Sequence, residues 1–131
     1  MNLLLDTHVA LWALTDDPRL GGAARALIAD EANHVAVSVA SLWEIAIKHA
    51  LSREGAGRMP ISAGEALSLF HTAGYDVLPI TAAHVVALEA LAPIHRDPFD
   101  RLLVAQALSE PLRLLTRDPL VARYSDTVIM V

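Results

Sequence analysis

Four acidic residues have the types and positions to do chemistry in this sequence: Asp6, Glu44, Asp100 and Asp118. Two carboxylates about 4 Å apart repel each other by about 4 kcal/mol at an effective dielectric constant near 20, and a divalent cation removes this penalty. Mg²⁺ is the natural candidate because it takes carboxylate and water oxygens as ligands. Zinc fits less well, because the chain has no cysteine and its six histidines show no paired spacing on one helix.

The elements that must position these acids alternate between strand and helix. Runs rich in Val, Ile or Leu predict strands at 2–6, 34–38, 76–80, 113–116 and 127–131. Between them, helices are predicted at 8–14, 22–33, 41–52, 63–73, 81–91 and 98–108, and a connecting loop at 52–64. The alternation predicts one α/β domain over residues 1–131, with a mostly parallel sheet of four to five strands covered on both faces.

This arrangement predicts that the acids meet at one edge of the sheet. Ligands of open parallel sheets bind beyond the carboxyl ends of the strands, near the point where the strand order reverses. Asp6 ends the first predicted strand, and Asp118 follows the fourth by two residues. Glu44 and Asp100 each lie in the first turn of a predicted helix. A metal held there, or a pair of metals, can activate water and neutralise charge at a phosphodiester.

Each acid also has an ordinary structural explanation as part of a helix cap. The spacing of Ser41 and Glu44 matches a capping box. Asp97 and Asp118 each precede a proline, as an N-cap aspartate commonly does, and we assign Asp97 to the cap rather than to a metal. Caps explain acids at helix starts, but they do not explain why several such starts meet at the same edge of a sheet.

Composition limits the function further. Ten Lys+Arg against fifteen Asp+Glu give a net charge of −5, which argues against a protein that holds nucleic acid mainly by long-range charge. Arg101 lies beside the proposed acids and can reach a flanking phosphate, although screening of the acidic pocket is the more ordinary role. His95 also neighbours the acids and can assist near the pocket, although a hydrogen-bonded bystander is the more ordinary role. No apolar run approaches the ~18 residues of a membrane span, so we expect no membrane partner.

Four segments taken together resemble a known family. They are Leu-Leu-Leu-Asp-Thr-His at 3–8, Ser-Leu-Trp-Glu-Ile-Ala-Ile-Lys at 41–48, His-Arg-Asp-Pro-Phe-Asp-Arg-Leu-Leu-Val-Ala-Gln-Ala at 95–107, and Thr-Arg-Asp at 116–118. In this order they resemble the PIN-domain ribonucleases and, more narrowly, the VapC-type toxins of bacterial toxin–antitoxin pairs. The resemblance covers nearly the whole chain, and the segment 95–107 is its most specific part.

The resemblance implies a three-layer α/β/α PIN-like fold and a set of roles for individual residues. Four acids match the positions that bind Mg²⁺ or Mn²⁺ and activate water for RNA hydrolysis: Asp6, Glu44, Asp100 and Asp118. Thr7 and Thr116 match polar positions that support the pocket. A cytoplasmic enzyme, a homodimer and a cognate antitoxin that blocks the site are also implied. The chain departs from many relatives in lacking an aromatic residue after Asp118 and at its C-terminus.

Two other classes of function remain open from the sequence. A phosphotransfer or phosphatase-type protein on a similar sheet would use Asp6 as its nucleophile. Against this class, His8 stands where a haloacid-dehalogenase-like phosphatase has a second aspartate, and a receiver domain needs a lysine after a late strand, whereas the only lysine is Lys48. The other class is a non-catalytic binding module whose acids are only caps, and such a protein would show no stabilisation by Mg²⁺ or Mn²⁺.

Overall fold

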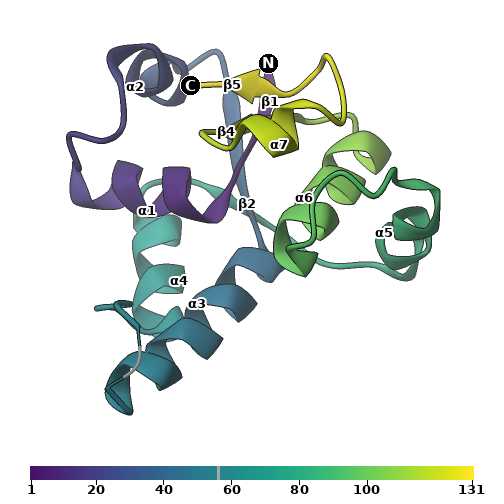
Figure 1. Ribbon diagram of the computed structural model, residues 1–131. Helices are drawn as coiled ribbons and strands as arrows, with labels where there is room; N and C mark the ends of the chain where they lie inside the picture. Colours follow the sequence, from purple (N-terminus) through teal and green to yellow (C-terminus); the bar gives the residue numbers. More distant parts are fainter. Residues whose placement is uncertain (56) are drawn as a thin grey trace.

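The strands of the computed structural model, which describes residues 1–55 and 57–131, form one parallel sheet (Figure 1). Its strands are β1 (Asn2–Leu5), β2 (His34–Ser38), β3 (Asp76–Leu78), β4 (Arg113–Thr116) and β5 (Ile129–Met130). Their order is β3-β2-β1-β4-β5, and each neighbouring pair is parallel. The strand order therefore reverses at β1, between β2 on one side and β4 on the other, and the prediction of a parallel α/β sheet is confirmed.

Helices cover both faces of this sheet. On one face lie α1 (Thr7–Thr15), α2 (Gly22–Ala29) and α4 (Ala63–Thr72), and on the other lie α5 (Ala82–Ala87), the 3₁₀ turn η1 (Leu88–Ala90), α6 (Pro98–Ser109) and α7 (Pro119–Ala122). Helix α3 (Val39–Arg53) continues directly from β2 and contacts both layers, through Ile45 on one side and Ala40 on the other. The fold is thus the predicted three-layer α/β/α arrangement.

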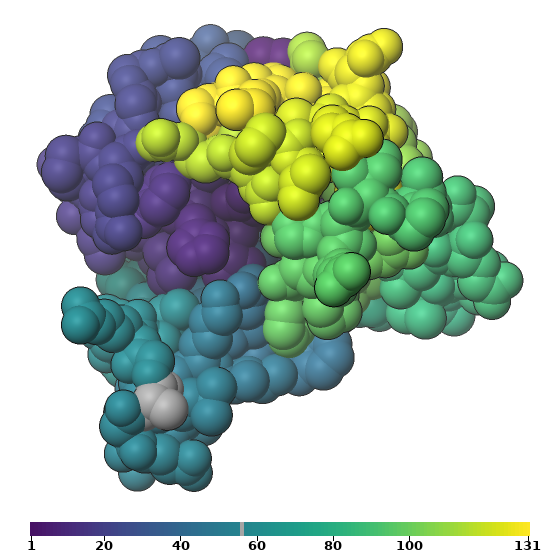
Figure 2. All heavy atoms as spheres, viewed as in Figure 1, coloured from purple at the N-terminus to yellow at the C-terminus, as the bar shows by residue number. Residues whose placement is uncertain are grey.

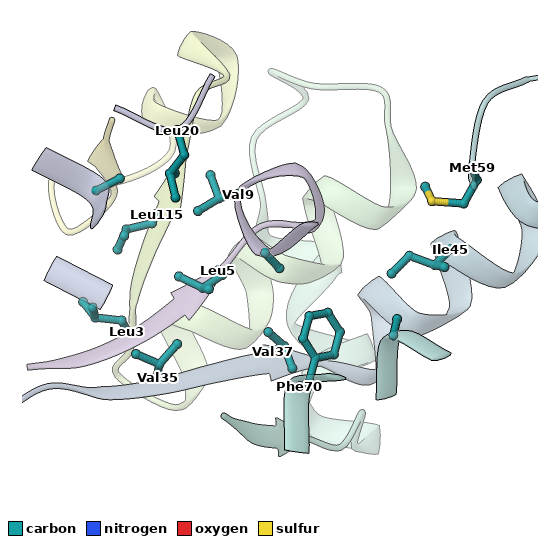
Figure 3. Close-up of a cluster of buried hydrophobic side chains, with 13 residues drawn as sticks. Leu3, Leu5, Val9, Leu20, Val35, Val37, Ile45, Met59, Phe70 and Leu115 are labelled. Atoms are coloured by element: carbon teal, nitrogen blue, oxygen red, sulfur yellow. The ribbon is translucent and has the colours of Figure 1, made fainter. Parts of the chain in front are cut away.

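The central strand shows why this sequence folds into layers. Side chains alternate between the two faces of a strand, so Leu3 and Leu5 enter the core shown in Figure 3, whereas Leu4 enters the opposite core. All three are fully buried. Burying a leucine side chain contributes about 2 kcal/mol, and a strand that is apolar on both faces is stable only where helices cover both. This packing fixes the position of Asp6, the next residue in the chain.

The start of α3 corrects one prediction about Glu44. The helix begins at Val39, and its N-cap is Ser38, whose Oγ accepts from the N–H of Ala40 at 2.9 Å. The predicted capping box between Ser41 and Glu44 is therefore wrong, and Glu44 lies in the second turn. The physical reason is that the strand passes into the helix without a loop, so the serine at the strand end caps the helix first.

Other predicted boundaries shift by a few residues for local reasons. Helix α2 ends at Ala29 because Asp30 adopts an extended conformation and its side chain accepts from the N–H of Ala32. Strand β3 ends before Pro79, which has no N–H to donate to a ladder. The predicted loop 52–64 overlaps α3 and α4 at its ends, and Ala56 within it lies outside the described residues. In the described ranges no helix is both long and apolar enough to cross a membrane.

Candidate active site

The site is built around Asp6, at the point where the strand order reverses. This carboxylate is only 7% exposed, and its Oδ1 accepts from the N–H of Val9 at 2.8 Å as the N-cap of α1. Its Oδ2 accepts from Thr116 Oγ1 at 2.6 Å, and Thr116 Oγ1 in turn accepts from the N–H of Asp118 at 3.0 Å. One threonine at the end of β4 therefore positions acids from two neighbouring strands. Burial raises the pKa of Asp6 in spite of these hydrogen bonds.

Asp100 enters the site from the first turn of α6. Asp97 caps this helix, as predicted, and accepts from the N–H groups of Phe99 and Asp100. Burial, followed by the charges of Asp97, Asp6 and Glu44, raises the pKa of Asp100 from 3.8 to about 7. These neighbouring charges act on Asp100 because the helix start faces the acids of β1 and α3.

Glu44 reaches the same cluster from α3, and only 4% of this residue is exposed to solvent. Its Oε2 lies 2.7 Å from Lys48 Nζ, one turn further along the helix, so the predicted i,i+4 pair is present. The charge of Glu44 acts on both Asp6 and Asp100. The structure therefore brings three of the four sequence-predicted acids into one electrostatic cluster.

Asp118 joins the site through His95. Its Oδ1 accepts from the N–H of Leu120 at 2.8 Å as the N-cap of α7, and its Oδ2 accepts from His95 Nε2 at 2.7 Å. Partial burial acts to raise the pKa of Asp118, but the hydrogen bond from His95 and that from the Leu120 N–H outweigh it, so the pKa is lowered. His95 Nε2 also lies 3.2 Å from Asp100 Oδ2. Ligand atoms of His95, Asp100 and Asp118 all lie within 4.8 Å of one another.

The residues expected to support the pocket take up different tasks. Thr7 Oγ1 donates to Ser41 Oγ at 2.9 Å and so joins the start of α1 to α3. Arg101 directs its Nη1 to the carbonyl oxygen of Ala92 at 3.0 Å and to the hydroxyl of Tyr124 at 3.1 Å. The guanidinium thus holds the segment before α6 and does not face the acids. Sequence reasoning did not reveal this role, because no local pattern links Arg101 to Tyr124.

The surface over the N-terminal segment is recessed. In Figure 2 the purple atoms of the N-terminal segment lie in a hollow between the blue surface of α3, the green surface of α6 and the yellow-green C-terminal part. The groups that meet at this edge offer carboxylate oxygens, and burial and mutual repulsion raise the pKa of two of them, Asp6 and Asp100. Several carboxylate oxygens gathered at one edge fit a hard divalent cation such as Mg²⁺ or Mn²⁺.

Comparison with known proteins shows the family to which the chain belongs. The family model of the PIN domain matches residues 3–126 of the chain. This chain belongs to the PIN domain family. A curated PIN-family relative, Ribonuclease VapC22 of Mycobacterium tuberculosis (strain ATCC 25618 / H37Rv), is 34% identical over 116 residues, which cover 88% of this chain and 86% of the relative.

Solved structures share the PIN fold at lower sequence identity. The VapBC2 structure from Rickettsia felis, bound to a DNA fragment from its promoter, matches with a TM-score of 0.68 and 17% identity over 100% of this chain and 98% of the other. VapBC-1 from nontypeable Haemophilus influenzae matches with a TM-score of 0.64 and 14% identity, over 100% of this chain and 97% of the other. FitAcB from Neisseria gonorrhoeae matches with a TM-score of 0.59 and 17% identity, over 98% of this chain and 96% of the other. These structures support the fold.

Proposed function

We infer that this chain is an endoribonuclease of the VapC type, the toxin of a toxin–antitoxin pair, and we propose that four acids form its divalent-metal site: Asp6, Glu44, Asp100 and Asp118. Membership of the PIN family and the likeness to Ribonuclease VapC22 support the activity. The observation that supports the site best is the convergence of these acids: Asp100 Oδ2 and Asp118 Oδ2 lie 3.2 Å and 2.7 Å from the same nitrogen of His95, and the charges of Asp6 and Glu44 both act to raise the pKa of the buried Asp100.

The described contacts argue against the two rival classes. Asp6 engages both carboxylate oxygens, with the Val9 N–H and with Thr116, and is almost fully buried, which disfavours a nucleophile. Asp6 and Asp118 do cap helices, but Asp100 and Glu44 accept no backbone N–H among the hydrogen bonds of residues 1–55 and 57–131. Helix capping therefore explains two of the four acids, whereas Asp100 and Glu44 cap no helix among the described residues.

The chain's own residues prepare the site for RNA. When bound, Mg²⁺ or Mn²⁺ supplies positive charge at the scissile phosphodiester and activates water for hydrolysis. Thr116 holds Asp6 by its Oδ2 and fixes the backbone of Asp118, so the two acids keep one relative orientation. Lys48 partly balances the charge of Glu44. The fixed carboxylates reduce the reorganisation that metal binding requires.

Cleavage of a defined RNA tests the proposal. Asp6→Asn and Asp100→Asn should abolish Mg²⁺- or Mn²⁺-dependent cleavage, whereas Asp97→Asn should retain it, since asparagine also caps helices well. Asp97 is the matched control because it lies on the same helix start as Asp100. Hydrolysis by activated water leaves 5′-phosphate and 3′-hydroxyl ends. Cyclic phosphate ends, or cleavage at the wild-type rate by either site variant, would contradict the proposal.

We also propose a cognate antitoxin, a homodimer and a cytoplasmic location, where RNA substrates occur. The likeness to the VapBC2 and VapBC-1 structures supports an antitoxin partner. A groove of about 710 Å³ has a lining that includes Trp12, Ile61 and Lys48, and Lys48 is the ion-pair partner of Glu44. Apolar side chains on α5, Val85 and Val86, are exposed and available to a second copy of the chain. Light scattering of the purified chain, alone and co-expressed with a candidate antitoxin, tests both assemblies.

A further inference from the structure

His95 connects two of the proposed metal ligands that belong to different elements. Its Nε2 lies 2.7 Å from Oδ2 of Asp118, which follows β4, and 3.2 Å from Oδ2 of Asp100, which lies on α6. The imidazole is 15% exposed and stands between the two carboxylates. A contact between residues 23 positions apart therefore joins the start of α6 to the end of β4.

The hydrogen bond at the other ring nitrogen fixes which one carries the proton. The backbone N–H of Asp97 donates to His95 Nδ1 at 3.0 Å, so Nδ1 acts as an acceptor. In a neutral imidazole one nitrogen accepts and the other carries the hydrogen. The proton therefore lies on Nε2 and points at Asp118 and Asp100. Metal binding through Nε2 would move the proton to Nδ1, where it would face the N–H of Asp97, so this geometry makes His95 a hydrogen-bond donor to the ligands.

The ring is held in this orientation from its backbone. The N–H of His95 donates to the hydroxyl of Tyr124 at 2.8 Å. Arg101 donates to the same hydroxyl at 3.1 Å and to the carbonyl oxygen of Ala92 at 3.0 Å. Together these bonds anchor the segment before α6 at Ala92 and at His95. The imidazole is consequently placed by the fold before any ligand arrives.

We propose that His95 is a positioning residue for the metal centre, an inference that rests on the proposed function. Its Nε2–H keeps the Asp118 carboxylate turned toward Asp100, so that both carboxylates face one cation. As a neutral donor it relieves the repulsion between the two acids without occupying a ligand position itself. Hydrogen bonds of this kind to metal ligands commonly account for about 10–100-fold in metal affinity.

Calorimetric titration of Mg²⁺ into wild type, His95→Gln and His95→Ala tests the proposal. Glutamine has an amide oxygen for the Asp97 N–H and an NH₂ group for Asp118, whereas alanine has neither. We expect His95→Ala to bind Mg²⁺ about 10-fold more weakly or worse, and His95→Gln to stay close to wild type. A loss that glutamine restores distinguishes hydrogen-bond positioning from a general packing defect, since the two variants remove the same ring.

Two spectroscopic measurements on the wild-type chain apply even if a variant fails to fold. Long-range ¹H–¹⁵N correlation of the ¹⁵N-histidine-labelled protein should show the His95 proton on Nε2 and a bare Nδ1, both before and after Mg²⁺ is added. Pulsed electron paramagnetic resonance of the Mn²⁺-loaded protein should show no directly bound ¹⁴N. A proton on Nδ1, or a directly bound nitrogen, would overturn the proposal by making His95 a ligand.

The outcomes separate this inference from the function on which it rests. Wild type that binds neither Mg²⁺ nor Mn²⁺ would defeat the proposed metal site itself. Wild type that binds Mg²⁺, together with a folded His95→Ala variant of equal affinity, would defeat only the role of His95.

Discussion

Replacing Asp100 with asparagine should stabilise the metal-free protein and, at the same time, abolish its response to Mg²⁺. The substitution removes one negative charge from a cluster in which burial, Asp97, Asp6 and Glu44 all disfavour it. If Asp100 served only to stabilise the fold, its substitution would make the protein less stable. A residue kept for binding a cation imposes a cost that its removal relieves.

The magnitude follows from the ionisation of Asp100. Its pKa rises from 3.8 to about 7, and each tenfold change in an ionisation equilibrium corresponds to about 1.36 kcal/mol, so the charged form costs about 4 kcal/mol in the folded state. Since 24% of the side chain is exposed, we halve this cost for solvent screening to about 2 kcal/mol. Losing a favourable charge at a helix N-terminus subtracts about 0.5 kcal/mol. The net gain of about 1.5 kcal/mol corresponds to about 6 °C in Tm.

The stability gained by Asp100→Asn should depend on pH in a defined direction. Because the folded-state pKa of Asp100 is raised, its contribution to stability is fully present below the unfolded pKa near 4 and is lost as pH rises through about 7. The advantage of Asp100→Asn should therefore be largest at pH 8 and shrink steadily toward pH 5.

Thermal and urea unfolding in EDTA at pH 8 and at pH 5, repeated with saturating Mg²⁺, provides the assay. Wild type should gain stability from Mg²⁺, by about 2.7 kcal/mol at 100 times the Kd, whereas Asp100→Asn should gain little. Asp97→Asn serves as the control and should keep its response to Mg²⁺. The reasoning is refuted if Asp100→Asn is less stable than wild type at pH 8 in EDTA, or if both respond equally to Mg²⁺.

Three further predictions follow from the same contacts. The affinity for Mg²⁺, measured by calorimetry, should fall by up to about tenfold for each pH unit below 7, because protons compete with the metal for Asp100, and should be constant above pH 7. An affinity that does not change from pH 5 to 8 would contradict this. Thr116→Val removes the donor to Asp6 and should cost about 2 kcal/mol of unfolding free energy, whereas Thr116→Ser should cost much less; equal losses would exclude the hydroxyl as the cause. Lys48→Met leaves the buried Glu44 carboxylate without its partner and should lower the free energy of unfolding by about 1 kcal/mol, less than for a fully buried pair because Lys48 is partly exposed. Mg²⁺ should restore part of this loss. A variant as stable as wild type would show that the pair contributes nothing.

The sequence was sufficient to predict the alternation of strands and helices and the convergence of the acids at one edge of the sheet. β1 is predictable because three consecutive leucines before an aspartate satisfy both faces of a buried parallel strand. The positions of Asp6 and Asp118 then follow from the general rule for the carboxyl ends of parallel strands. The convergence required only the direction of the strands, so the exact order of the sheet did not have to be known.

Local motifs failed where two residues compete for one role. Ser38 and Ser41 both precede apolar helical residues, and only the three-dimensional end of β2 decides that Ser38 caps α3. The capping-box pattern of Ser41 and Glu44 is a matter of spacing alone, and spacing cannot show where the strand stops.

The role of His95 was beyond sequence reasoning for a different reason. Its ring orientation depends on a backbone N–H from Asp97 and on Tyr124, and its partner Asp118 comes from another element. Such contacts depend on tertiary packing, and no periodicity or composition reports them. The same holds for Arg101, for which the sequence left open screening of the acidic pocket or a phosphate contact, whereas its guanidinium donates to the carbonyl oxygens of Ala92 and Leu88.

A crystal of the wild-type protein soaked in Mn²⁺ tests the metal site most directly, through its anomalous scattering. We predict an anomalous peak within ligand distance of the carboxylates of Asp6 and Asp100, with Glu44 and Asp118 turned toward it. Fully ordered side chains with no peak at this edge, or a peak elsewhere on the molecule, would contradict the account.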